Sequence, residues 1–397
     1  MLPAREDFPA LRRYHQGKPI VYLDSAATTQ KPRQVIDRIQ DLYLDGVSNV
    51  HRAVNFLADE VTTAFEESRE TVARRIGAHT RETVFVQNAT HGINYVWAAL
   101  SARLNRPARV ITSTLEHHSN LLPWMRGTVR FVPWAEDGEL SVSSLAGMLK
   151  EKPDLVALST ASNFLGTLQP VADIVAACHE AGTQVLLDIS QTIAHARFDV
   201  NDIPCDYLVF SGHKVYGPGG SGVLFVREDH LDSTPPAILG GSMVKEVHQD
   251  RYVEQMAPHK YEAGSPCTEA VIGLAAALDY LDHFGEAEIA GYENALTQHA
   301  LERLADLNDC KVLGPPVGKP RAPLVSFSLR GMEPNTVART LSNRANIVLR
   351  SGFLCAQPAH DQLGVGPTLR ASFALYNTRE EIDQLVDLLR ELRRLLV

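Results

Sequence analysis

One lysine of this sequence follows an apolar segment in a position where it could take part in catalysis. Lys214 stands in the run Ser211-Gly212-His213-Lys214, directly after the apolar segment 207–210 and before a glycine-rich turn. If 207–210 is a strand of a parallel sheet, Lys214 lies at its carboxyl end, where α/β folds bind ligands. A desolvated lysine can form a Schiff base there, because burial lowers its pKa. Taken alone, a lysine in such a turn is more often a surface residue.

An acidic residue at the end of a neighbouring segment changes this interpretation. Asp188 ends the apolar segment 185–187. Such an acid can cap a helix, bind a metal or pair with a pyridinium ring. Asp188 and Lys214 are expected one strand apart, both at carboxyl ends. An aspartate for the ring nitrogen and a lysine for the aldehyde are the two groups that pyridoxal phosphate requires of a protein.

Two further polar runs follow predicted strands. The first, residues 88–94, joins a strand to a helix and contains Thr90, whose hydroxyl and neighbouring N–H groups suit a phosphate, although such a threonine is usually only a cap. The second contains His117 and His118. A histidine here can stack on an aromatic cofactor and move protons. A metal pair is less favoured, because adjacent residues of an extended chain point to opposite sides.

The elements that must position these residues alternate between strands and helices. Candidate strands occur at 84–87, 109–112, 129–132, 155–158, 185–188, 207–210 and 222–226. Several of them are apolar on both faces, as strands of a helix-covered parallel sheet must be. Amphipathic helical patterns lie between them, including Val61, Phe65 and Val72 on one face. The pattern predicts an α/β fold with a mostly parallel, seven-stranded sheet and right-handed crossovers.

The pattern changes after about residue 285. A long polar helix at 286–304 precedes a strand at 324–329, a helix at 336–344, a strand at 347–350 and a final helix at 380–395. We therefore expect a large domain over 18–285 and a smaller α+β domain over 286–397, which residues 1–17 join. The absence of a Pro/Gly/Ser-rich linker predicts that the two pack tightly.

Composition excludes several classes of protein. The chain has 397 residues and a formal net charge of −9, with 45% hydrophobic and 21% charged residues, which is ordinary globular composition. The acidic balance argues against nucleic acid or a membrane as the main partner. Five widely spaced cysteines without a C-x-x-C pair suit a reducing compartment. With no signal-peptide pattern at the N-terminus, a cytoplasmic enzyme is expected.

Together these motifs resemble fold-type I pyridoxal-phosphate enzymes of aminotransferase class V, and within them the SUF-type (group II) cysteine desulfurases and selenocysteine lyases. The resemblance extends from Tyr22-Leu23-Asp24-Ser25-Ala26-Ala27 to Tyr376-Asn377-Thr378. It implies Lys214 as the Schiff-base residue, Asp188 at the ring nitrogen, Gln191 at the phenolic oxygen and His117 stacked on the ring. The expected cofactor-binding set is Thr90, Ala89, His117, Asp188, Gln191, Ser211, His213, Lys214 and Ser265.

The resemblance also implies the substrate side of the site and its partners. Arg370 and Asn163 would bind a substrate carboxylate, Arg370 through a bidentate pair. The expected substrate-binding set is completed by Arg350, Ala27 and His51, the last in a His51-Arg52 pair at the mouth of the site. Ser265, in Glu262-Ala263-Gly264-Ser265-Pro266, would reach the phosphate site of a partner subunit in a homodimer. The substrate would be L-cysteine or an S- or Se-substituted analogue.

Cys355 determines which reaction the resemblance implies. A desulfurase needs a thiolate that takes the substrate sulfur as a persulfide and passes it to an acceptor, such as a protein. The family motif reads R-x-G-H-H-C, whereas this chain has Arg350-Ser351-Gly352-Phe353-Leu354-Cys355. Apolar neighbours raise a thiol pKa in general, so the lost imidazoles predict a weaker nucleophile unless Arg350 compensates. The alternative for Cys355 is an inert residue.

Three functions therefore remain open at this point. The first is a cysteine desulfurase that forms L-alanine with Lys214, Cys355 and His117 as catalytic residues and no metal. The second is a C–S lyase (β-elimination), or another class V lyase or transferase of a biosynthetic pathway, which does not use Cys355. The third is a non-enzymatic sulfur-transfer scaffold, against which the intact Lys214, Asp188, Gln191 and Arg370 argue.

Overall fold

A seven-stranded mixed sheet forms the centre of the larger part of the molecule. The computed structural model describes residues 3–51 and 54–396. The strand order is β4-β10-β9-β8-β7-β5-β6, and only β10 runs antiparallel to its neighbours. The strands are β4 (Thr83–Val86), β5 (Arg109–Thr112), β6 (Thr128–Phe131), β7 (Leu155–Ser159), β8 (Gln184–Asp188), β9 (Tyr207–Ser211) and β10 (Gly222–Val226). The prediction of a mostly parallel seven-stranded sheet is confirmed.

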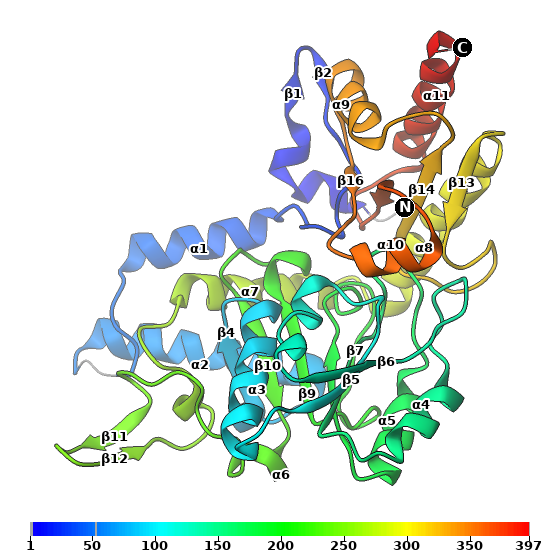
Figure 1. The fold of residues 1–397 in the computed structure, drawn as a ribbon. Coiled ribbons are helices and arrows are strands. Elements are labelled where there is room, and N and C mark those ends of the chain that lie inside the picture. Colours follow the sequence, from blue (N-terminus) through cyan, green and yellow to red (C-terminus); the bar gives the residue numbers. More distant parts are fainter. Residues whose placement is uncertain (1–2, 52–53, 397) are drawn as a thin grey trace.

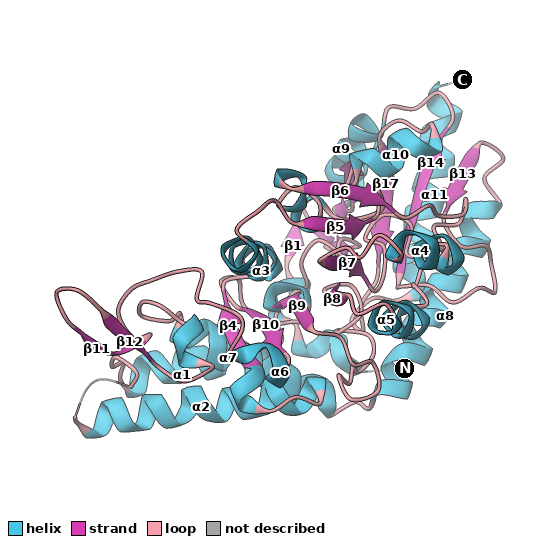
Figure 2. Ribbon diagram, turned by 60° about the horizontal axis from the view of Figure 1, so that its bottom comes forward, coloured by secondary structure: helices cyan, strands magenta, loops and turns pink. Residues whose placement is uncertain are grey.

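Helices cover both faces of this sheet (Figure 2). On one face Val156, Leu187 and Phe210 pack in a core shared with helices α2, α4, α5 and α7; on the other Val209 and Leu224 pack against α3. The helices of this part are α1 (Arg33–Asp45), α2 (Phe56–Ile76), α3 (Ala89–Leu104), α4 (Val142–Leu149), α5 (Val171–Glu180), α6 (Glu228–Leu231) and α7 (Thr268–Asp282). Because both faces are covered, the interior strands are largely apolar instead of alternating, whereas the edge strand β6 is mostly exposed.

A second sheet with its own core lies beside the first (Figure 1). Its strand order is β13-β14-β17-β16, all antiparallel. Its elements are β13 (Cys310–Leu313), β14 (Leu324–Leu329), β16 (Arg350–Gly352), β17 (Thr368–Ser372), α8 (Glu286–Ala305), α9 (Pro334–Ala345), α10 (Gln357–Leu363) and α11 (Arg379–Leu396). The strand expected at 347–350 is divided: β15 (Ile347–Val348) leaves this sheet and pairs with β3 (Val21–Tyr22).

Smaller elements complete the fold. Strands β1 (Tyr14–His15) and β2 (Lys18–Pro19) form one hairpin, and β11 (Val244–Val247) and β12 (Tyr252–Glu254) form another. The β11–β12 hairpin extends away from the body of the molecule (Figure 1). Among the described residues, every helix is too short or too polar to cross a lipid bilayer.

Candidate active site

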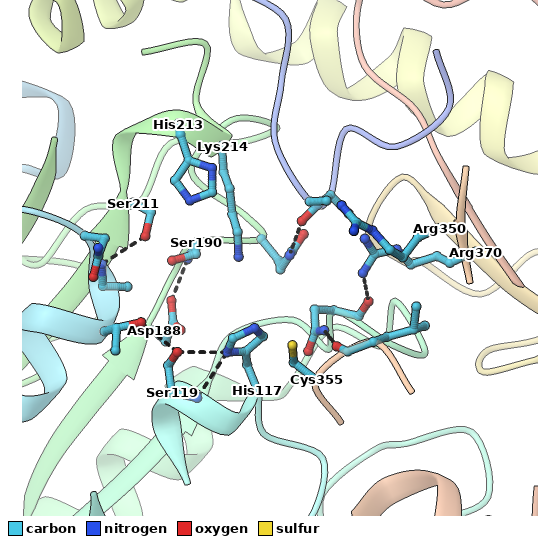
Figure 3. A pocket seen from close by; sticks show the side chains of 18 residues that line it. His117, Ser119, Asp188, Ser190, Ser211, His213, Lys214, Arg350, Cys355 and Arg370 are labelled. Carbon is cyan, nitrogen blue, oxygen red and sulfur yellow. Dashed lines mark hydrogen bonds between the residues drawn. The ribbon is translucent and has the colours of Figure 1, made fainter. Parts of the chain in front are cut away.

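The site lies where β7, β8 and β9 end. In the sheet register Asp188 pairs with Val209, and Lys214 follows β9 within a single 3₁₀ turn, so both reach the carboxyl edge of neighbouring strands. A cavity of about 360 Å³ opens there, and the side chains converge on it (Figure 3). It is lined by Ala26, Ala27, Asn88, Ala89, Thr90, His117, Ser119, Asn163, Asp188, Ser190, Gln191, Ser211, His213, Lys214, Arg350, Leu354, Cys355 and Arg370.

This lining contains all but two of the residues assigned above to the catalytic, cofactor-binding and substrate-binding sets. Ser265 is exposed and lines a separate cavity next to Cys267. His51 is also absent from the lining; its Nε2 lies 3.2 Å from Glu66 Oε1 instead. Arg52, expected beside it, lies outside the described residues. The roles assigned to the lining residues stay predictions, but the fold brings them to one cavity.

The backbone before Lys214 is fixed by a group of donors that the sequence did not indicate. The carbonyl oxygen of His213 accepts hydrogen bonds from Thr28 Oγ1 at 3.0 Å, Thr29 Oγ1 at 3.1 Å and Lys31 Nζ at 3.1 Å. The Thr29 N–H adds a fourth at 3.0 Å. These residues precede α1 and lie far from Lys214 in the chain, so only the tertiary fold reveals that they position it.

Burial controls the protonation of the basic groups in the cavity. Desolvation lowers the pKa of Lys214, although the Asp188 carboxylate opposes this effect. Desolvation and the charge of Lys214 lower the pKa of His117 to about 3. Desolvation likewise lowers the pKa of His213 to about 4. Both imidazoles are therefore neutral at pH 7, and His117 Nδ1 accepts the Ser119 N–H at 3.1 Å.

The start of α3 is tied to the neighbouring strands by hydroxyl groups. Ser211 Oγ accepts the Ala89 N–H at 2.9 Å, and Thr90 Oγ1 lies 2.7 Å from Ser119 Oγ. The first helical N–H groups of α3 thus lie at the cavity, together with several hydroxyls. Free N–H groups at a helix N-terminus and hydroxyl donors suit an anionic group such as a phosphate.

A buried arginine marks the opposite end of the cavity. Arg370 is 3% exposed, donates from Nη1 to the Asn163 carbonyl at 2.7 Å, and lies 3.4 Å from Asp24 Oδ1. Asp24 also pairs with Arg350 at 2.8 Å. Arg370 Nε has no hydrogen-bond partner among the described residues. Two guanidinium groups thus share one carboxylate, which leaves a net positive charge suited to a second anion.

Cys355 enters the cavity from a short loop between β16 and α10. The Leu354 carbonyl accepts from Asn163 Nδ2 at 2.7 Å, and the Cys355 carbonyl accepts the His118 N–H at 2.9 Å. Both residues have left-handed backbone, with φ of 54° and 56°. Leu354 lines the cavity beside the exposed Cys355, whereas Phe353 packs edge-on against His360.

Gly222 is the first residue of β10 and lies against Asn88, just before α3, so there is no room for a side chain at this position. A Cβ there would lie 2.5 Å from Asn88 Cα and 2.8 Å from Asn88 N. We expect Gly222→Ala to lower the free energy of unfolding by about 1–3 kcal/mol, because the backbone of the 88–90 segment must move. Urea denaturation measures this change.

The matched control for that substitution is Gly219→Ala in the turn just before. A Cβ at Gly219 would have no heavy atom within 4 Å. We expect this variant to unfold at the same urea concentration as the parent. Equal stability of the Gly222→Ala and Gly219→Ala proteins would show that the packing around Asn88 is looser than the structure indicates.

The fold and this cavity agree with comparisons to known proteins. The family model for class V aminotransferases matches residues 21–385. The chain therefore belongs to the class V aminotransferase family, whose members are pyridoxal-phosphate enzymes. Within it, the chain is homologous to cysteine desulfurases over nearly its whole length. It is 41% identical to a cysteine desulfurase of Pectobacterium atrosepticum, covering 99% of this chain and 98% of that protein.

Other relatives carry similar names. A probable cysteine desulfurase of Streptomyces coelicolor is 39% identical, covering 98% of this chain and 96% of that protein. The apo structure of a cysteine desulfurase from Thermococcus onnurineus superposes with a TM-score of 0.94 at 34% identity, over 99% of this chain and 98% of that one. The structure of the Escherichia coli cysteine desulfurase CsdA superposes with a TM-score of 0.90 at 34% identity, over 99% of this chain and 98% of that one.

Proposed function

We propose that this protein is a pyridoxal-phosphate-dependent cysteine desulfurase that converts L-cysteine to L-alanine and carries the sulfur on Cys355. The observation that supports this most directly is the lining of one cavity by Lys214, Asp188 and Cys355. The first two are the groups that the cofactor requires, and the third is the nucleophile that desulfuration adds. Assignment to the SUF-type subgroup remains a prediction.

The residues present fit the cofactor. Its phosphate would lie at the N-terminus of α3, held by Thr90, Ser211 and His213. Asp188 Oδ1 accepts the Ser190 N–H at 2.9 Å, which orients the carboxylate for a ring nitrogen. The buried Ser190 hydroxyl has no partner among the described residues, as expected for a polar group that lines a ligand site. When bound, pyridoxal phosphate supplies an electron sink for charge that develops at the substrate Cα.

Each remaining residue has a role that follows from its surroundings. The buried Arg370 binds the substrate carboxylate through its unsatisfied donors, with Asn163 beside it. Lys214, whose pKa is lowered by burial, holds the cofactor and moves the Cα proton at neutral pH. Gln191 donates Nε2 to the Ala26 carbonyl at 3.0 Å, which holds its amide at the cavity wall. His117 is neutral, so it can stack on the ring and accept or donate a proton.

The sulfur step is a displacement at the substrate Sγ. The Cys355 thiolate forms the new S–S bond, and the substrate Sγ–Cβ bond breaks with its electron pair on carbon. Cβ then takes a proton and the product is alanine. Cys355 is left as a persulfide, which an acceptor thiol removes. Because Cys355 is exposed, an acceptor protein or small thiol can reach it.

We also propose a cytoplasmic homodimer. Ser265 is exposed and outside the cavity of its own chain, which supports a contribution to the phosphate site of a partner subunit. None of the five cysteines is paired with another, as expected in a reducing compartment.

A C–S lyase is the second candidate function, and the Cys355 loop favours it. Leu354 and Phe353 stand where the family has two imidazoles, and Leu354 lines the cavity. An apolar neighbour does not stabilise a thiolate. β-Elimination would need Lys214, Asp188 and Arg370 but not Cys355.

The identity of the product separates the two candidates. We expect the purified protein, with L-cysteine and a reductant, to release alanine and sulfide in equal amounts. Chromatography of the derivatised amino acids measures alanine, and a coupled lactate dehydrogenase assay measures pyruvate. Pyruvate and ammonia in place of alanine would contradict desulfuration and support elimination.

A further inference from the structure

A cluster of metal-ligating side chains lies outside the proposed active site. His51 precedes α2, Glu66 lies within α2, and His259 begins the turn His259–Tyr261. One ligand atom of each lies within 4.8 Å of the others. Within residues 3–51 and 54–396 this is the only trio of histidine, cysteine or acidic residues that meets this distance. None of the three lines the cavity that holds Lys214.

The donor set and its spacing suit a transition-metal ion. Two imidazoles and one carboxylate, with a fourth position open, is a common zinc ligand set. With bonds of about 2.0–2.1 Å, tetrahedral ligand atoms are ~3.3 Å apart. His51 Nε2 and Glu66 Oε1 are already 3.2 Å apart. The ligand atom of His259 lies within 4.8 Å of the other two, so it would move by at most ~1.5 Å to reach the tetrahedral spacing.

The surroundings of Glu66 resemble the outer shell of a metal ligand. Arg69 donates from Nε to Glu66 Oε2 at 2.8 Å and from Nη2 to Oε1 at 3.2 Å. Arg69 is itself fixed by Glu262 at 2.6 and 2.9 Å and by the Thr83 carbonyl. Carboxylates that ligate a metal are commonly hydrogen-bonded in this way.

The charge balance favours a cation. The single positive charge of Arg69 faces two carboxylates, those of Glu66 and Glu262. These three side chains together carry a net charge of −1.

We propose that His51, Glu66 and His259 bind a divalent transition-metal ion, for which Zn²⁺ is the expected occupant. The side chain of His51 is 29% exposed, so a water molecule can take the fourth position. Binding would join the segment before α2 to the segment that leads from His259 to Ser265. The site does not depend on desulfurase activity, because none of its ligands belongs to the proposed catalytic set.

Isothermal titration with ZnCl₂ and visible absorption with Co²⁺ test this site on the full-length protein with its cofactor, after removal of metal by chelation. Cys267 and Cys355 are exposed and thiolates also bind zinc, so both are first blocked with iodoacetamide. We expect one tight site per chain and the d–d bands of four-coordinate Co²⁺. His259→Phe should weaken binding by at least about 10–100-fold, the loss typical of removing even an outer-shell partner, because one direct ligand is lost while the ring contact with His51 is kept.

His248→Ala is the matched control. His248 and Glu246 form an exposed pair at 3.4 Å on the β11–β12 hairpin, with two potential ligands but no third. This variant should bind zinc as the parent does. His51→Phe is a second test of the site, and circular dichroism of the metal-free variants checks their folding. Parental affinity in both His51→Phe and His259→Phe, equal loss in His248→Ala, or no binding by the parent would overturn the proposal.

Discussion

Lys214→Ala is expected to abolish turnover of L-cysteine, with a loss of at least about 10⁴-fold. In the proposed function the lysine amine both attaches the cofactor and moves the Cα proton, and general acid–base catalysis alone contributes about 10²–10⁴-fold. Four hydrogen bonds to the His213 carbonyl fix the backbone before Lys214, and Lys214 is the only lysine among the described residues that line the cavity. Steady-state alanine release measures the loss, and mass spectrometry after borohydride reduction shows whether cofactor is covalently attached.

Lys260→Met provides the control for loss of a buried lysine. Lys260 Nζ donates to the Leu231 carbonyl at 2.7 Å, and Tyr261 Oη donates to the same oxygen at 2.7 Å. The acceptor therefore remains satisfied when Lys260 is removed. This variant should keep its activity and its cofactor. A Lys214→Ala protein with turnover within tenfold of the parent would contradict the proposed site.

Cys355→Ala is expected to lower alanine formation by at least about 10³-fold while the cofactor remains bound. Without the thiolate no group accepts the substrate sulfur, and the other cavity residues are unchanged. The absorbance of the bound cofactor checks that the site is intact. Alanine release at the parental rate would exclude Cys355 as the sulfur carrier. If the variant forms pyruvate but no alanine, the protein is a desulfurase that also has a residual elimination activity.

Cys267→Ala is the matched control for this substitution. Cys267 and Cys355 are the two cysteines that are exposed, but Cys267 lies outside the cavity that contains Lys214. Its removal should leave the rate of alanine release unchanged. A comparable loss in both variants would indicate that sulfur passes through Cys267 as well.

The sequence predicted the structure correctly where burial and chemistry allow only one pattern of residues. The strands inside the large sheet are apolar on both faces, and all seven strands were expected within one residue of their observed bounds. The position of Asp188 and Lys214 at neighbouring carboxyl ends followed from the strand order alone. The motifs around them then identified the family, which the comparison with class V aminotransferases confirms.

The parts that the sequence did not predict depend on contacts between distant segments. Strand β17 was missed because Arg370, a residue with low strand preference, lies buried at its centre as a candidate ligand of substrate. Asp24 could not be recognised as the shared partner of Arg350 and Arg370, since it precedes both by more than 300 residues. The position of His51 beside Glu66, away from the cavity, is also set by packing and not by a local pattern.

The left-handed backbone at Leu354 and Cys355 has a consequence for transplanting this loop between homologues. Each such non-glycine residue costs about 1–2 kcal/mol unless its surroundings hold it. Here the amide of Asn163 and the backbone N–H of His118 hold it, from positions well over 100 residues away in the chain. A chimaera in which only residues 350–358 are exchanged would contain the thiol but would not orient it toward the cavity. The segments that contain Asn163 and His118 would have to be exchanged as well.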